Sequence, residues 1–91
     1  MMADAFRSFV GHEVVIDTHS SYIYIGMLVG VTDFTLDLRD VDVHDRSEST
    51  TTKEKYVMEA RKYGVKKNRK GVTVRLDMVV SISNLEDIIE Y

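Results

Sequence analysis

The sequence lacks cysteine, proline and tryptophan, and it contains no long apolar run. Without cysteine, neither a disulfide framework nor a thiolate-bound zinc site can form. No run approaches the roughly 18 apolar residues that cross a bilayer, and no hydrophobic leader opens the chain. We therefore expect a cytoplasmic protein with no membrane partner.

The common catalytic patterns are also missing, including Gly-x-Ser-x-Gly, a phosphate-binding glycine loop and a His–acid pair at catalytic spacing. The three histidines, His12, His19 and His44, lie far apart in the sequence. Asp40, Asp42 and His44 alternate and could hold a divalent cation from one strand face, but a solvated strand face is the simpler explanation. We expect no enzyme, no metal site and no cofactor.

The 91 residues are enough for one domain, which we assign to 1–91. A chain of this length buries only about 60–65% of its unfolded surface, so small domains often need further support. Because disulfides and thiolate-bound zinc are excluded, oligomerisation is the expected source of that support.

Charge is segregated along the chain. Residues 61–76 carry seven basic residues and no acid, whereas the remainder carries five basic residues and all fifteen acids. The segment therefore has a charge of +7 against −10 elsewhere. Such segregation predicts that the basic residues face either an anionic partner molecule or an acidic part of the same chain. The densest part, which we call the basic segment, comprises Lys66, Lys67, Arg69 and Lys70.

The apolar pattern predicts a short helix followed by five strands. Phe6, Phe9 and Val10 share one face of a helix over 3–10, and Gly11 suits the position after it. Alternating residues predict strands, and Asn84 is a candidate N-cap of a closing helical turn. The expected strands cover residues 13–17, 22–31, 34–45, 71–76 and 78–83.

A long insert, about 45–67, separates the third and fourth strands. Its first part, 46–55, is polar and predicts a mobile loop. The apolar residues of 56–65 fit a helix and a strand equally well, so that part stays open. Five short antiparallel strands with a small helix predict a mostly β fold, a small bent barrel.

Two features of the strands predict bends. Gly26 and Gly30 lie inside an otherwise β-favouring run, where glycine usually marks a bend or a bulge. In the third strand, the apolar residues change from even to odd numbers near Arg39–Asp40, which predicts a β-bulge.

A hairpin of the third and fourth strands offers a structural explanation for the basic segment. Pairing Thr35 with Leu76 would bring the acid-rich third strand beside the base-rich insert, giving cross-strand pairs of about 0.2–1 kcal/mol each. The pairs so predicted are Asp42 with Arg69 and His44 with Lys67. The alternative is that the segment tracks an RNA backbone, and both can hold in part.

The N-terminal part of the chain comprises the predicted helix, "VGHEVVIDT", the turn after it and "GMLVGVTDFTLDL". Together these resemble the start of the Sm-like (LSm) family, including its first motif. The spacer inside the motif is one residue longer than usual. The matching residues are Gly26, Leu28, Asp33, Leu36, Asp37 and Leu38.

"VRLDMVVSIS" resembles the second motif of the family, with Arg75 and Asp77 at matching positions. Leu76 stands where glycine is usual and Met78 where asparagine is usual, so both are expected to crowd the loop. The resemblance covers nearly the whole chain apart from about 43–68.

The resemblance implies a ring of identical subunits in which strand four of one subunit pairs with strand five of the next. These strands contain no proline that would protect an edge from pairing. The family resemblance also implies that single-stranded, often uridine-rich RNA binds around the pore of the ring. The bases would be held by stacking and by contacts to their edges. The implied RNA-binding residues are Asp33, Phe34, Thr35, Asp37, Arg75 and Asp77.

An alternative use of the same ring remains open. Asp37 replaces the asparagine that bonds a base edge in the family, which removes both amide donors and adds a negative charge. Asp37 and Arg75 could instead form a structural ion pair. The ring would then be a scaffold that binds a protein partner at the insert.

Overall fold

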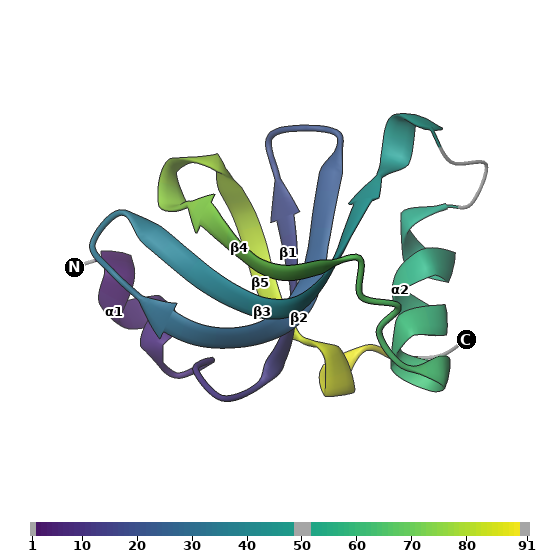
Figure 1. Cartoon of the computed structure of the whole chain (residues 1–91), viewed down its shortest axis with the longest axis horizontal. Coiled ribbons are helices and arrows are strands. Elements are labelled where there is room, and N and C mark those ends of the chain that lie inside the picture. The colour runs from purple at the N-terminus through teal and green to yellow at the C-terminus, as the bar shows by residue number, and fades with distance from the viewer. Residues whose placement is uncertain (1, 49–51, 90–91) are drawn as a thin grey trace.

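A computed structural model of the chain describes residues 2–48 and 52–89 and has a mostly β fold (Figure 1). A short helix α1 (Met2–Arg7) precedes the first strand, and a second helix, α2 (Lys53–Tyr63), follows the third. Single 3₁₀ turns occupy Arg46–Glu48, Leu76–Met78 and Leu85–Asp87. The strands are β1 (Glu13–Thr18), β2 (Tyr22–Val31), β3 (Thr35–Asp45), β4 (Arg69–Arg75) and β5 (Val79–Asn84).

The five strands form one antiparallel sheet in the order β4-β3-β2-β1-β5. The expected mostly β class, the N-terminal helix and the five antiparallel strands are confirmed, and the strongly bent open sheet is compatible with a small barrel. Strands β4 and β5 are the two edges of the sheet. Each edge therefore presents a row of backbone groups that another strand can pair with.

The predicted bulge in β3 is present and explains Gly26. Between the pairs Ile25–Asp42 and Met27–Arg39, β3 has one residue more than β2, and Asp40 adopts a φ of 52°. A Cβ on Gly26 would lie 3.0 Å from the carbonyl oxygen of Arg39, so a larger residue opposite the bulge would force the backbone of β3 to shift. A Cβ on Gly30 would meet Asp37 at an ordinary 3.5 Å, so packing does not demand that glycine.

The inner face of the sheet encloses the larger apolar core, which we call the inner cluster. Side chains from four strands converge there, and α1 closes one end with Ala3, while Phe6 and Phe9 pack against its margin. The helix ends at Arg7, three residues earlier than expected, and Gly11 adopts a φ of 91° just before β1. The buried members of the cluster are Ala3, Val14, Ile16, Leu28, Leu36, Leu38, Val41, Val74 and Leu76.

Helix α2 covers part of the outer face and forms a second core, the outer cluster. Thr52 caps the helix by accepting a hydrogen bond from the N–H of Lys55, and Gly64 ends it with a φ of 94°. The loop expected over 46–55 is therefore wrong at 46–48, a 3₁₀ turn, and at 53–55, which is helical; 49–51 lie outside the described residues. The buried members are Val15, Ile23, Ile25, Val57, Ala60 and Leu85.

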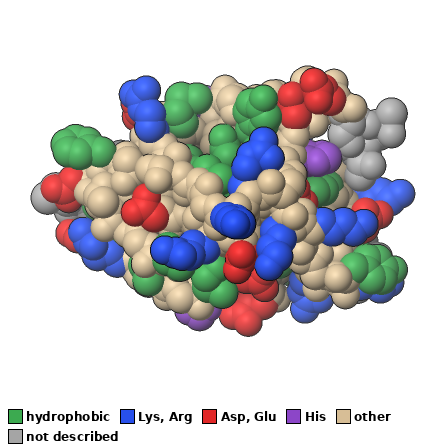
Figure 2. Space-filling model, viewed as in Figure 1, with side chains coloured by type: hydrophobic (Ala, Val, Ile, Leu, Met, Phe, Trp, Pro, Cys, Tyr) green, Lys and Arg blue, Asp and Glu red, His purple; other side chains and the backbone are tan. Residues whose placement is uncertain are grey.

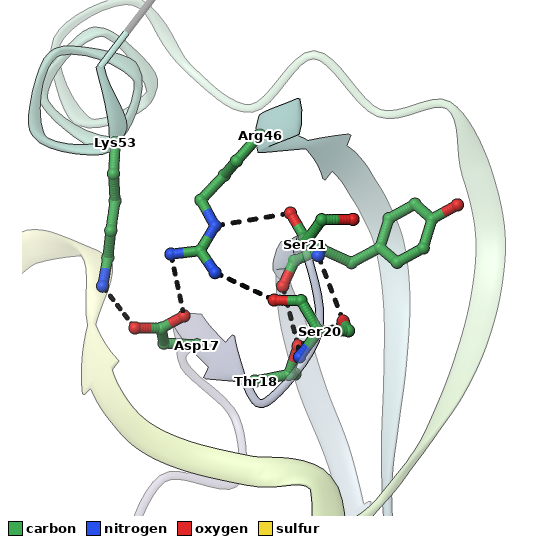
Figure 3. Close-up of polar contacts among 7 residues, drawn as sticks. Asp17, Thr18, Ser20, Ser21, Arg46 and Lys53 are labelled. Atoms are coloured by element: carbon green, nitrogen blue, oxygen red, sulfur yellow. Dashed lines mark hydrogen bonds and ion pairs between the residues drawn. The ribbon is translucent and has the colours of Figure 1, made fainter. Parts of the chain in front are cut away.

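Charged groups fasten the insert to the sheet (Figure 3). Lys53, in the first turn of α2, donates to the half-buried carboxylate of Asp17 on β1. The guanidinium of Arg46 lies 3.7 Å from the same carboxylate and donates a hydrogen bond of 2.8 Å to the carbonyl oxygen of Ser20. Asp17 thus joins the start of α2 to the end of β3.

The pairing of β3 with β4 differs from the prediction by one residue. Thr35 pairs with Arg75 instead of Leu76, because residues 76–78 form a 3₁₀ turn and leave the strand. The predicted pairs Asp42–Arg69 and His44–Lys67 are consequently wrong, since Val41 opposes Arg69. Strand β4 also begins two residues earlier than expected, at Arg69.

A 3₁₀ turn at Leu85–Asp87 follows β5, at the place where a helical turn was expected. Asn84 occupies the N-cap position, but its side chain makes no capping hydrogen bond. Within residues 2–48 and 52–89, neither helix has the length and apolar character needed to cross a bilayer.

Candidate nucleic-acid interface

Two turns lie side by side at one end of the sheet. The first joins β2 to β3 and contains Asp33 and Phe34, and the second follows β4 and contains Asp77. The N–H of Leu76 donates a hydrogen bond of 2.9 Å to the carbonyl oxygen of Phe34, and Thr35 pairs with Arg75 across the two strands. Five of the six residues implied by the family resemblance therefore lie on or beside these two turns, and Asp37 lies two residues along β3.

The turn between β2 and β3 is held by Thr32. Its hydroxyl accepts hydrogen bonds from the N–H groups of Phe34 at 3.2 Å and Thr35 at 3.0 Å, and it lies 2.7 Å from the hydroxyl of Thr35. The turn displays the Phe34 side chain with 79% of its surface exposed. Thr35 is therefore committed to the turn, while the ring of Phe34 is available for stacking.

Arg75 stands next to Asp77 across the second turn. Its Nη2 donates to Oδ2 of Asp77 at 2.5 Å, and the two side chains are 74% and 62% exposed. The contact uses one guanidinium nitrogen, and most of the Arg75 side chain remains exposed to solvent. An exposed arginine face can stack on a base, and its remaining donors suit a phosphate.

Asp37 does not pair with Arg75, so that alternative is wrong. Oδ1 of Asp37 instead accepts a 3.0 Å hydrogen bond from the hydroxyl of Thr73 on β4. Asp37 and Arg75 are diagonal neighbours on one face of the β3–β4 pair, because Thr35 opposes Arg75 and Asp37 opposes Thr73. The carboxylate therefore borders the same surface as the guanidinium.

Leu76 does not crowd the turn, contrary to expectation. Its side chain is 7% exposed and belongs to the inner cluster, whereas Met78 is partly exposed. The 3₁₀ turn directs Leu76 into the core, where a leucine contributes apolar contacts that glycine would lack.

The basic segment lies at the other end of β4. Lys66 and Lys67 precede the strand, Arg69 and Lys70 begin it, and all four are exposed. Nζ of Lys67 lies 3.6 Å from Oδ1 of Asp40, both side chains being about two-thirds exposed. The seven residues of β4 span about 20 Å, so the segment lies roughly that far from Phe34 and Arg75.

Arg39 is a basic residue that sequence reasoning did not include. It lines two neighbouring hollows on the β3–β4 surface together with Lys70, one of about 520 Å³ that reaches Asp37 and one of about 560 Å³ that reaches Lys67. Figure 2 shows Lys and Arg side chains gathered over the middle of this face, where β4 crosses in Figure 1. Strand alternation was the available signal, because Arg39 lies two residues after Asp37 and so faces the same way.

Asp42 and His44 have a structural role in docking α2. Asp42 is only 9% exposed and accepts two hydrogen bonds. The hydroxyl of Tyr56 donates one of 2.6 Å to Oδ2, and Nδ2 of Asn68 donates one of 3.3 Å to Oδ1. The ring of His44 stacks on Tyr56 with centroids 3.9 Å apart. Burial, followed by the contact with Asp42, raises the pKa of Tyr56 far above its usual range.

The strand face proposed for a cation is not assembled. The bulge separates Asp40, which contacts Lys67, from Asp42, which contacts Tyr56. Across the residues that the structure describes, no three His, Asp or Glu side chains are grouped so as to hold a metal ion.

Comparison with models of known protein families gave no match, and no curated protein matches this chain.

Proposed function

We propose that this chain is a divergent Sm-like protein whose subunits form a ring and bind single-stranded RNA, in RNA processing or chaperoning. The observation that carries the proposal is the junction of the two motif turns, which presents Phe34 and Arg75 together. An exposed aromatic ring beside an arginine plane suits an unpaired base, because stacking needs no particular base identity.

The remaining residues have supporting roles. Asp37 accepts hydrogen bonds only, so it selects bases that present a donor at their edge. Asp33 and Asp77 border the site, and Asp77 orients the guanidinium of Arg75. Arg39 and Lys70 line the adjacent hollow and, with the rest of the basic segment, attract the phosphate backbone.

Two open sheet edges support the ring. Strand β4 ends one side of the sheet and β5 ends the other, and neither contains proline. At the same edges, Val72, Val79 and Ile82 are only partly buried against the inner cluster. Pairing β4 of one copy with β5 of the next would complete the backbone hydrogen bonds and cover these side chains, and one such heterologous contact repeated can close a ring.

The test is fluorescence anisotropy of labelled oligouridine, titrated with the full chain at two salt concentrations. We expect binding that weakens steeply with salt, and a loss of about tenfold or more in affinity for Arg75→Ala. The control is Lys55→Ala, which removes the same charge from an exposed position on α2 and should change the affinity little. Equal affinities for the three proteins would refute the assignment of Arg75.

A second candidate is a ring that serves as a scaffold and binds a protein partner at the insert. The specific observation in its favour is that Asp37 and Arg75 already have partners, Thr73 and Asp77. Tightly bound RNA on the purified protein, read from its ultraviolet absorbance ratio, would count against the scaffold. Absence of oligouridine binding even at low salt would favour it.

A further inference from the structure

A groove of about 380 Å³ lies between α2, strand β5 and the segment after it. Its floor is apolar, and the two serines of β5 that border it point to the same face as α2, because they pair with Val15 and Asp17 of β1. Since α2 packs over β1 and β2, the small serine side chains leave a hollow above the edge strand. Residues that line it include Val15, Val57, Met58, Ser81, Ser83 and Ile88.

The rim of this groove is mainly acidic, because Lys53, the basic residue that also lines it, is paired with Asp17. Glu54, in the first turn of α2, and Asp87, in the last 3₁₀ turn, both border it and are exposed. Glu86 adds a further exposed carboxylate beside Asp87. Ile89, which is 74% exposed, continues the apolar lining outward. The groove therefore suits a segment whose side chains have an aliphatic stem and a positively charged end, as lysine does.

Such a segment lies at the opposite edge of the same sheet. The start of β4 carries the basic segment, and β5 is followed directly by Glu86 and Asp87. If β4 of one copy joins β5 of another in antiparallel fashion, the first residues of β4 lie beside the last residues of β5. Parallel pairing would instead place the basic segment beside Val79, far from these acids. Charge complementarity thus favours the antiparallel arrangement.

We propose that the groove between α2 and β5 receives the basic segment of the next copy of this chain, with Lys66 and Lys67 meeting Glu54 and Asp87. This inference rests on the ring proposed above and adds a role for the insert, because α2 supplies one wall of the groove and leads into the segment that enters it. It also gives Lys66 and Lys67 a role at the contact between subunits in addition to the attraction of RNA, and Lys67 would exchange its exposed pair with Asp40 for this contact. Lys70 and Arg39 face the hollow assigned to RNA.

The test is a charge swap followed by light scattering across a range of protein concentrations. Lys66→Glu/Lys67→Glu should raise the dissociation constant of the assembly by about tenfold or more, and Glu54→Lys/Asp87→Lys should do the same. All four changes in one chain restore opposite charges at each contact and should return the dissociation constant to within about threefold of the original. The matched control, Lys55→Glu/Lys62→Glu, makes the same charge change on the exposed face of α2 and should have little effect.

The outcomes separate this inference from the ring itself. A monomeric unsubstituted chain would overturn both. An assembly that tolerates each pair of changes, or that the fourfold swap fails to restore, would overturn the groove contact and leave the ring standing.

A second readout does not depend on assembly strength. Because the chain has no cysteine, Lys66→Cys and Asp87→Cys proteins can be mixed and oxidised. A disulfide that forms in the mixture and not in either protein alone supports the contact, and its absence in an intact assembly contradicts it.

Discussion

The two faces of the sheet are built in different ways. The inner cluster is apolar throughout and is closed by α1, whereas the outer cluster is bordered by polar contacts from Asp17 and Asp42. Apolar burial is strong but non-directional, while a hydrogen-bonded carboxylate fixes a position. The inner face therefore supplies most of the stability, and the outer face determines where α2 sits.

The largest expected effect comes from breaking the inner face. Leu28 is fully buried in the inner cluster, and Leu28→Ala should lower the free energy of unfolding by about 2–5 kcal/mol, because it removes apolar contacts and leaves a cavity. Urea denaturation measures the difference. A loss below about 1 kcal/mol would contradict the inference that the inner face supplies most of the stability. Val57→Ala, at a buried position of α2 in the outer cluster, gives the comparison for the outer face.

A smaller effect is expected from Tyr56, which docks α2 on the outer face. Tyr56→Phe removes the donor to Asp42 and should cost about 1.5–3 kcal/mol at neutral pH. The pKa of Tyr56 is raised in the folded state, so its contribution is complete below the unfolded pKa of about 10 and is lost as pH rises further, by about 1.4 kcal/mol per pH unit.

Unfolding experiments on both proteins between pH 7 and 11 measure this dependence. The difference in unfolding free energy between the original chain and Tyr56→Phe should narrow above pH 10. A constant difference would mean that Tyr56 ionises as readily in the folded chain as in the unfolded one.

The smallest effect on stability is expected at Phe34, which belongs to neither cluster. Phe34→Ala should change the free energy of unfolding by less than about 0.5 kcal/mol, because the side chain is already in solvent. Its oligouridine affinity should nevertheless fall by about tenfold, the value of one stacked base. Phe34→Tyr keeps the ring and is the control. Lost stability with unchanged affinity would assign Phe34 to packing.

The inner face could be predicted from the sequence, and the outer face only in part. Alternation through β2 placed Ile23 and Ile25 on one face and Leu28 on the other, although Val29, expected with the first set, is exposed. The shift near Asp40 located the bulge. The type of the insert stayed open because Tyr56, Met58 and Ala60 fit either period. Thr52 before Lys55 and Gly64 after Tyr63 were the local helix signals that could have settled it.

The candidate site was predictable in its residues more than in its contacts. Its two turns come together as the motifs imply, but a one-residue difference in register changed every predicted charge pair. That difference arises in the 3₁₀ turn at Leu76, whose short local hydrogen bonds leave no periodic pattern in the sequence. Arg39 shares the face of Asp37 by simple alternation, but it lies outside both motifs and outside the basic run 61–76, so no pattern in the sequence assigned it to the site.

The bulge opposite Gly26 bends the sheet between its two edges and so sets the angle at which β4 and β5 face outward. When identical copies join edge to edge, each turns by the same angle, and the sum of those turns decides whether the series closes or continues as a filament. In the proposed ring, the backbone at Gly26 and Asp40 would set the corner angle of a polygon, and a change in that backbone geometry would alter the number of sides.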